Sequence, residues 1–389
     1  MSKPDYQGRG IFNLMVSIRN ACSSEQHQDQ GPVCSLLDPE QLSEARHIML
    51  IVVDGMGVAQ LEDHCPDGAL ANASAGHLTS VFPSTTASAI TTFMSGTAPI
   101  THGLTGWHMW FRELGVVGAP LPFHVRGSRD DLHHWHMDAA ELFKTRSLFA
   151  DLSRDSYIIQ PAKLFDSAYT RAHQGQAKQK SFKNLPGMLG QLESIAQGSN
   201  PSYSYAYWPS LDTLSHIHGA HSFESAQHLR ELDQAIADLA KRLKGTGTLL
   251  LVCADHGFVD TRPETVILLE AHRDLSQTLL LPLCGEPRTV YCYVRNGAED
   301  DFTSYISEHL QQTCEVHSSA RLLADGYLGE GEQHPQIETR LGSHVLLMKE
   351  QYCLVDRIAG EPGPFRQVGV HGGMSDAELL VPLINFGLE

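Results

Sequence analysis

Two long apolar runs, each ending in an aspartate, constrain the fold of this chain most strongly. Residues 48–53 lead directly into Asp54, and residues 249–254 lead into Asp255 and His256. Both runs are continuously apolar and do not alternate with polar residues, which is typical of strands buried on both faces of a parallel sheet. The sequence therefore predicts an α/β protein with polar side chains at the carboxyl ends of central strands.

Other segments extend this pattern along all 389 residues. Further strands are predicted at 77–82, 203–208, 289–294, 345–355 and 379–386. Helices are predicted at 11–21, 86–95, 138–153, 185–196, 222–243 and 300–312. Alternating strands and helices favour a three-layer α/β/α sandwich around a mostly parallel sheet.

The positions of the two Asp-ended apolar runs and of other polar candidates further along divide the chain into three regions. We expect residues 1–45 to form an N-terminal lead-in, and residues 46–260 together with 369–389 to form the core that carries the candidate functional residues. The block at 261–368 interrupts the core between two segments that carry polar candidates. We expect this block to be an inserted cap.

Composition excludes some classes of function. The formal net charge is −17, and no stretch is dense in Lys or Arg, so a nucleic-acid polymer is not an expected partner. No apolar window is long enough to span a bilayer, and the N-terminus shows no signal-peptide pattern. Eight cysteines without CxxC pairing are typical of buried thiols in a reducing compartment. We expect a cytoplasmic protein that does not act at a membrane.

Six carboxylate and imidazole side chains are candidate metal ligands. They are Asp54, Asp212, His216, Asp255, His256 and His371. Ligand sites in open parallel sheets lie beyond the carboxyl ends of the strands, so these side chains are expected to converge. Mixed Asp and His donors suit Zn²⁺ or Mn²⁺ better than Mg²⁺. The set predicts two divalent metal ions, zinc or manganese.

A hydroxyl at the start of a predicted helix is the candidate nucleophile. The segment 82–86 ends in Thr85 and Thr86, and a helix is predicted to begin there and to end at Gly96. The free backbone N–H groups of the first turn, notably that of Ala87, favour an anionic phosphoryl group. A threonine hydroxyl needs a metal or a base to become a nucleophile, which the candidate ligands supply. This chemistry alone does not choose between Thr85 and Thr86.

These motifs resemble the alkaline phosphatase superfamily, and within it the nucleotide pyrophosphatase/phosphodiesterase branch. That branch pairs a strand ending in Asp-Gly with Phe-Pro-x-x-Thr, followed at fixed offsets by Gly, Pro and His-Gly. The offsets fall on Gly96, Pro99 and His102-Gly103 when they are counted from Thr86. The resemblance therefore selects Thr86 as the nucleophile.

The resemblance also implies a distribution of ligands and a mechanism. One metal would be held by Asp212, His216 and His371. The other would be held by Asp54, Asp255, His256 and the Thr86 hydroxyl. The resemblance also favours zinc over manganese as the metal. In-line attack by Thr86 on phosphorus would give a phospho-threonine intermediate, which water then hydrolyses. The implied substrate is a small phosphorylated molecule with a phosphodiester or pyrophosphate bond.

One departure from the family pattern concerns substrate binding. Twenty-one residues after the nucleophile the family has an Asn that donates to a phosphoryl oxygen, and this chain has Trp107. Trp107 is therefore a candidate substrate-binding residue of different chemistry. A phosphonate hydrolase and a phosphomonoesterase remain alternatives, as does a catalytically silent metal-binding protein on the same fold. The sulfatase signature Cys-x-Pro-x-Arg is absent.

Overall fold

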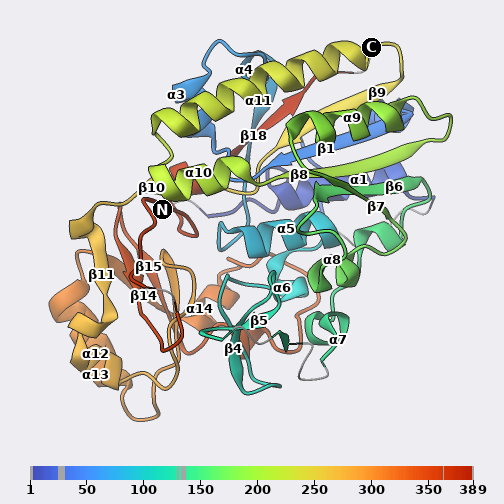
Figure 1. The fold of residues 1–389 in the computed structure, drawn as a ribbon. Helices are drawn as coiled ribbons and strands as arrows, with labels where there is room; N and C mark the ends of the chain where they lie inside the picture. Colours follow the sequence, from blue (N-terminus) through green and yellow to red (C-terminus); the bar gives the residue numbers. More distant parts are fainter. Residues whose placement is uncertain (1–2, 25–30, 129–130, 133–136, 362, 388–389) are drawn as a thin grey trace.

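The computed structural model describes residues 3–24, 31–128, 131–132, 137–361 and 363–387. Its main element is a seven-stranded sheet (Figure 1). Across the sheet the strands are β2 (Ser74–Thr79), β18 (Leu380–Asn385), β9 (Thr248–Cys253), β1 (His47–Val53), β8 (Ser202–Trp208), β6 (Asp155–Pro161) and β7 (Lys178–Phe182). β18 is antiparallel to both of its neighbours, and the pairs formed by the other strands are parallel. This confirms the predicted mostly parallel sheet.

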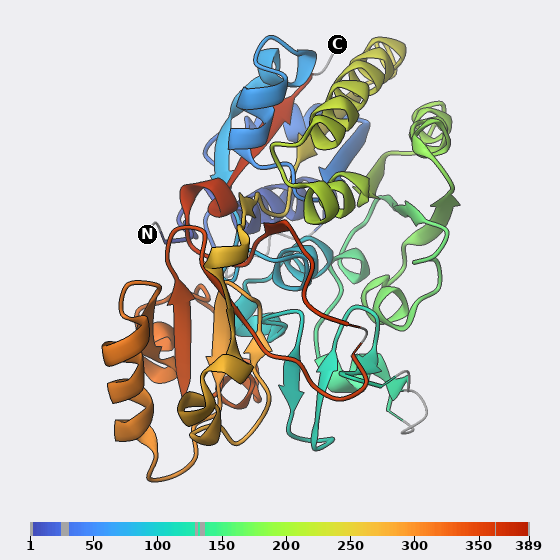
Figure 2. The same cartoon turned by 60° about the vertical axis from the view of Figure 1, so that its left-hand side comes forward.

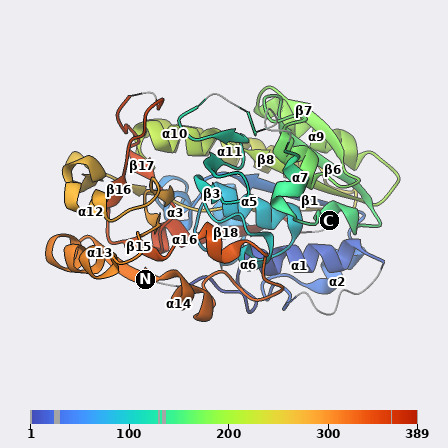
Figure 3. The same ribbon diagram turned by 90° about the horizontal axis from the view of Figure 1, so that it is seen from below.

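Helices cover both faces of this sheet and complete the α/β/α sandwich (Figures 1 and 3). One layer contains α3 (Val58–His64), α4 (Ala69–Asn72), α9 (Leu185–Ala196), α10 (Ser210–His218) and α11 (Phe223–Arg242). The other contains α1 (Ile11–Cys22), α2 (Pro39–Glu44) and α5 (Thr86–Ser95). Every residue of β1, β8 and β9 is buried, as two covering layers require.

Smaller sheets lie apart from the central one (Figure 2). A four-stranded sheet has the order β12 (Cys284–Gly285), β13 (Thr289–Cys292), β15 (His344–Met348) and β14 (Cys314–Ser318). It packs with α12 (Arg273–Gln277) and α13 (Glu299–Tyr305) around its own apolar cluster. A three-stranded meander of β3 (Met109–Phe111), β4 (Val116–Ala119) and β5 (His124–Val125) meets β12 through a bridge between His108 and Gly285. The segment 106–108 and the turn after β12 are therefore held together.

Several predicted elements differ from the observed ones. The strand expected at 77–82 is β2, which ends at Thr79. The helix expected at 138–153 is α7 (Ala139–Phe143) followed by a separate turn at Leu148–Ala150, because Lys144 takes a left-handed conformation with φ of 53°. The strand expected at 345–355 is divided by a turn into β15 and β16 (Cys353–Val355), which lie in different sheets. In each case an apolar run continues through a break in the backbone pattern.

Two neighbouring strands at one side of the sheet, β6 and β7, were missing from the predicted set. β7 carries the sequence Lys-Gln-Lys-Ser-Phe, in which only Phe182 is buried. β7 is an edge strand, and such strands show little apolar periodicity. β6 lies between β7 and β8, and only part of its residues are buried. Their sequence signal is therefore weak.

A buried ion pair joins the four-stranded sheet to the segment that leads into β18 of the central sheet. The Arg288 guanidinium donates to both carboxylate oxygens of Glu378, at 3.0 and 2.7 Å, and both side chains are at most 1% exposed. Glu378 also accepts a hydrogen bond from the N–H of Gly373, in the loop that carries His371. Burial alone would raise the pKa of Glu378, but the charge of Arg288 and these hydrogen bonds hold it below its usual range. The ion pair thus holds the turn after β12 against the loop that carries the candidate ligand His371.

We expect Arg288→Met to destabilise the protein by about 3–5 kcal/mol, because it leaves the Glu378 carboxylate buried without its cation. Equilibrium unfolding in urea measures this change. Arg321→Ala, which removes the exposed partner of Asp325, is the control and should leave the unfolding midpoint unchanged. Equal midpoints for both variants would contradict a structural role for the buried pair.

Candidate active site

The carboxyl ends of β1 and β9 place three candidate ligands together. Asp54 directly follows β1, and Asp255 and His256 follow the neighbouring strand β9. His256 Nε2 lies 3.4 Å from an oxygen of Asp54 and 3.4 Å from one of Asp255. The N–H groups of Gly55 and His256 each donate to Asp255 Oδ1 at 3.0 Å. One oxygen of each aspartate is therefore left facing His256.

Thr86 lies against this group. It is the first residue of α5, and its Oγ1 is 3.1 Å from His256 Nε2. The N–H groups of a helix's first turn have no intrahelical acceptor, and Ala87 belongs to this turn. A phosphoryl group bonded to Thr86 would meet these N–H groups and the positive end of the helix dipole.

A second group of candidate ligands lies beside the first. Asp212 and His216 share one face of α10, with Asp212 Oδ1 3.3 Å from His216 Nε2 and 3.9 Å from His371 Nε2. His216 Nδ1 is hydrogen-bonded at 2.8 Å to the carbonyl of Gly369, which orients the ring. The rings of His256 and His371 stack with centroids 3.7 Å apart. The two groups are therefore adjacent.

The electrostatics of these groups indicate a need for cations. Asp54 Oδ1, Asp212 Oδ1, Asp255 Oδ2 and His371 Nδ1 are buried and have no hydrogen-bond partner among the described residues. Burial and the nearby charges of Asp212 and Asp255 raise the pKa of Asp54 well above its usual value. Burial and the neighbouring imidazoles lower the pKa of His371. Divalent cations would offset the clustered negative charge and coordinate the unpaired oxygens, so the residues fit two metal ions.

A cavity of about 520 Å³ opens onto Thr86 and the second group. Thr86, Asp212, His216 and His371 line its polar end. Apolar side chains line other parts of the wall, among them Trp107, Leu268, Leu283, Val355 and Phe365. Trp107 is 40% exposed, so its indole is available to a bound molecule. The cavity has room for a phosphoryl group together with an organic substituent.

Two functional candidates were not predicted from the sequence. Glu286, in the turn after β12, is buried and lines the cavity. Its Oε1 accepts hydrogen bonds from the Thr85 hydroxyl at 2.6 Å and the Trp107 N–H at 2.7 Å. Burial raises its pKa to about 7. The second candidate is Tyr207, whose hydroxyl donates to the Asp54 carboxylate. Neither residue has a motif around it, because both reach the site through tertiary packing.

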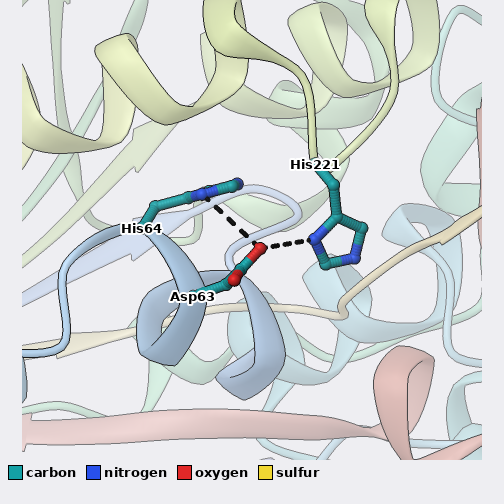
Figure 4. A group of neighbouring side chains, drawn as sticks. All are labelled: Asp63, His64 and His221. Carbon is teal, nitrogen blue, oxygen red and sulfur yellow. Dashed lines mark hydrogen bonds and ion pairs between the residues drawn. The ribbon is translucent and has the colours of Figure 1, made fainter.

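A third cluster of possible ligands lies at the surface. Asp63, His64 and His221 converge as Figure 4 shows, with Asp63 Oδ2 2.8 Å from His221 Nδ1 and 3.7 Å from His64 Nδ1. The side chains of Asp63 and His221 are about half exposed, and Asp63 Oδ2 already accepts a hydrogen bond from His221. Water and these hydrogen bonds satisfy such groups, in contrast to the buried unpaired atoms beside Thr86.

The structure thus brings together all seven residues predicted to bind metal. Asp54, Asp255, His256 and Thr86 form one group, and Asp212, His216 and His371 form the other. Ala87 is buried in the first turn of α5, and Trp107 lies on the cavity wall.

The fold is that of an alkaline phosphatase-like hydrolase. The model of the type I phosphodiesterase / nucleotide pyrophosphatase family matches residues 48–374, and the chain belongs to this family. No curated protein matches the sequence. No helix within the described residues has the length and apolar character needed to cross a membrane.

Solved structures with the same fold include two enzymes of different specificity. Murine ectonucleotide pyrophosphatase/phosphodiesterase 5 superposes with a TM-score of 0.65 at 15% identity, over 86% of this chain and 87% of that chain. Phosphonoacetate hydrolase from Sinorhizobium meliloti 1021, in complex with phosphonoformate, superposes with a TM-score of 0.63 at 16% identity. The superposition covers 89% of this chain and 91% of that chain. Human ectonucleotide pyrophosphatase/phosphodiesterase 5 gives 0.63 at 15% identity, over 87% of each chain.

We expect protein loaded with Zn²⁺ and freed of excess metal to retain about two ions per chain, because two groups hold unpaired buried ligands. Elemental mass spectrometry measures this. Asp212→Ala should retain about one ion, since the second group then lacks its carboxylate.

His221→Ala is the matched control for the surface cluster and should retain both ions. Loss of an ion from His221→Ala, with none lost from Asp212→Ala, would place the metal at the surface cluster and contradict the assignment.

Proposed function

We propose that this protein is a two-metal hydrolase that cleaves a phosphodiester or pyrophosphate bond through Thr86. The convergence of six ligand candidates around a hydroxyl at a helix N-terminus supports this most directly. Membership of the type I phosphodiesterase family points to the same reaction class. We further propose zinc as the natural metal, with manganese as the alternative, because the donors are carboxylates and imidazoles.

The proposed roles follow from position. Asp54, Asp255 and His256 would hold one ion together with Thr86, and Asp212, His216 and His371 would hold the other. Such ions promote loss of the hydroxyl proton and offset negative charge on phosphoryl oxygens. Gly369 fixes the His216 ring through its carbonyl, and the hydroxyl of Tyr207 orients the Asp54 carboxylate.

In the first step the Thr86 hydroxyl proton passes to solvent, and the Thr86 Oγ1–P bond forms as the P–O bond to the leaving group breaks. The leaving oxygen takes the electron pair. The N–H of Ala87 and its neighbours at the start of α5 stabilise charge on the phosphoryl oxygens. In the second step a water oxygen bonds to phosphorus as the Thr86 Oγ1–P bond breaks. One water proton passes to Thr86 Oγ1, and the phosphorylated product is released. The substrate's organic part would lie against Trp107 and the apolar wall.

The superposed structures support two proposals for the substrate class, a phosphodiester and a phosphonate. A threonine-to-alanine variant of the murine protein is described as inactive and was solved in complex with AMP. The bacterial enzyme is a phosphonoacetate hydrolase, and one of its structures contains phosphonoacetate. We propose the diester reaction first, because the family model that matches is that of the phosphodiesterases. Phosphonate hydrolysis is the second candidate, because Trp107 replaces the family Asn.

Thr86→Ala should lower turnover of bis-p-nitrophenyl phosphate by at least about a thousandfold, because the nucleophile is lost. Steady-state kinetics measures this on protein whose metal content is determined in parallel. The remaining ligands, Asp54, Asp255 and His256, should keep their ion.

Thr86→Ser is the matched control, because it keeps the hydroxyl and should retain turnover. Unchanged turnover in Thr86→Ala would remove Thr86 from the mechanism. Absence of turnover in the unmodified, metal-loaded protein on diester, monoester and phosphonate substrates would instead favour a catalytically silent protein.

A further inference from the structure

Glu286 is held rigidly beside the candidate nucleophile. Its turn is bound to the segment 106–108, because Gly285 and His108 exchange two backbone hydrogen bonds at 2.7 and 3.2 Å. On the other side it packs against Gly372, where an added Cβ would lie 2.6 Å from the Cβ of Glu286. Glu286 is therefore fixed between Trp107 and the loop that carries His371.

The two carboxylate oxygens of Glu286 have different surroundings. Oε1 accepts two hydrogen bonds, from Thr85 and Trp107. Oε2 accepts no hydrogen bond from any described residue, and it is not among the fully buried unpaired atoms. Because Glu286 lines the cavity together with Thr86 and Asp212, its accessible oxygen faces the space in which a substrate would bind.

No described Lys or Arg forms an ion pair with this carboxylate; of the titratable groups nearby, His216 lowers its pKa and Asp212 raises it. Its two hydrogen-bond donors, a hydroxyl and a backbone N–H, are uncharged. The buried Arg126 of the cavity wall is paired at 2.7 Å with each of Asp356 and Glu361. Arg288 is paired with Glu378. The ionised Glu286 therefore presents negative charge to the cavity, where low dielectric strengthens its effect.

We propose that Glu286 is a specificity-determining residue that favours phosphodiesters over phosphomonoesters and over phosphonates that carry a carboxylate. This inference rests on the proposed function. A diester has one negative charge at phosphorus, whereas a monoester at alkaline pH has two and ionised phosphonoacetate has a further carboxylate. Each added charge is repelled by Glu286 Oε2, while a hydroxyl or amino group on the esterified substituent can donate to it.

Glu286→Gln tests this charge discrimination. The variant keeps an oxygen for the Thr85 and Trp107 hydrogen bonds and removes the charge. Assays at about pH 8.5 lie above the pKa of about 7, so the native residue is ionised. The ratio of kcat/KM for bis-p-nitrophenyl phosphate to that for p-nitrophenyl phosphate should fall by at least about tenfold, because the monoester gains. An unchanged ratio, or an equal loss with both substrates, would overturn the proposal.

Glu270→Gln is the matched control. Glu270 also lines the cavity but is exposed, so water screens its charge and the ratio should not change. Thermal unfolding of both variants shows whether the fold is kept. A similar fall in the ratio for Glu270→Gln would mean that general cavity charge, and not Glu286, sets the preference.

Binding of inorganic phosphate gives a readout that does not need turnover. Isothermal titration of metal-loaded Thr86→Ala and Thr86→Ala/Glu286→Gln with phosphate should show at least about tenfold tighter binding by the double variant. Binding of bis-p-nitrophenyl phosphate should change much less. Equal phosphate affinities would overturn the proposal.

The kinetic comparison and the phosphate titration together distinguish failure of this inference from failure of the proposed function. If the native protein hydrolyses none of these esters, the proposed function fails, and the phosphate titration still decides the role of Glu286. If diester turnover is present, and Glu286→Gln changes neither the kcat/KM ratio nor the phosphate affinity, only the inference about Glu286 fails.

Discussion

The arrangement of the site depends on the burial of three carboxylates within one small volume. Asp54, Asp212 and Asp255 each have an oxygen that is buried and unpaired among the described residues. Their mutual repulsion and loss of hydration oppose folding unless positive charge lies between them. The imidazoles of His216, His256 and His371 surround these carboxylates, and divalent cations coordinated by both kinds of group meet the requirement best. A metal centre at this position would in this sense be part of the fold as well as of the proposed chemistry.

The parallel sheet explains how residues far apart in sequence reach this volume. β1 lies between β8 and β9, so its carboxyl end brings Asp54 beside Asp255 and beside the start of α10. Gly55 takes a φ of 77°, and a Cβ there would lie 2.4 Å from the Phe258 ring, so the turn after Asp54 requires glycine. This turn directs the Gly55 N–H to Asp255. Backbone geometry, and not loop flexibility, thus positions the first ligand group.

The sequence indicated the core of the site better than its periphery. Asp54, Asp255 and His256 could be predicted because each follows a continuous apolar run whose end must lie at the sheet edge. Thr86 could be distinguished from Thr85 only through the family spacing, and the structure gives a physical difference. The Thr86 hydroxyl faces His256, whereas the Thr85 hydroxyl donates to Glu286.

Features that depend on long-range packing could not be predicted in the same way. Glu286 lies about two hundred residues from its partner Thr85 in sequence, and no local pattern links them. The edge strand β7 and its neighbour β6 lacked an apolar period, and Lys144 interrupted a run that otherwise favoured a helix. Substrate discrimination, which we assign to Glu286, accordingly depends on contacts that only the tertiary structure shows.

The most direct test of this account is a crystal structure of the zinc-loaded protein with anomalous diffraction recorded at the zinc edge. The account predicts two anomalous peaks, one among Asp54, Asp255, His256 and Thr86, and one among Asp212, His216 and His371. A single peak, or peaks only at the surface cluster of Asp63, His64 and His221, would contradict it.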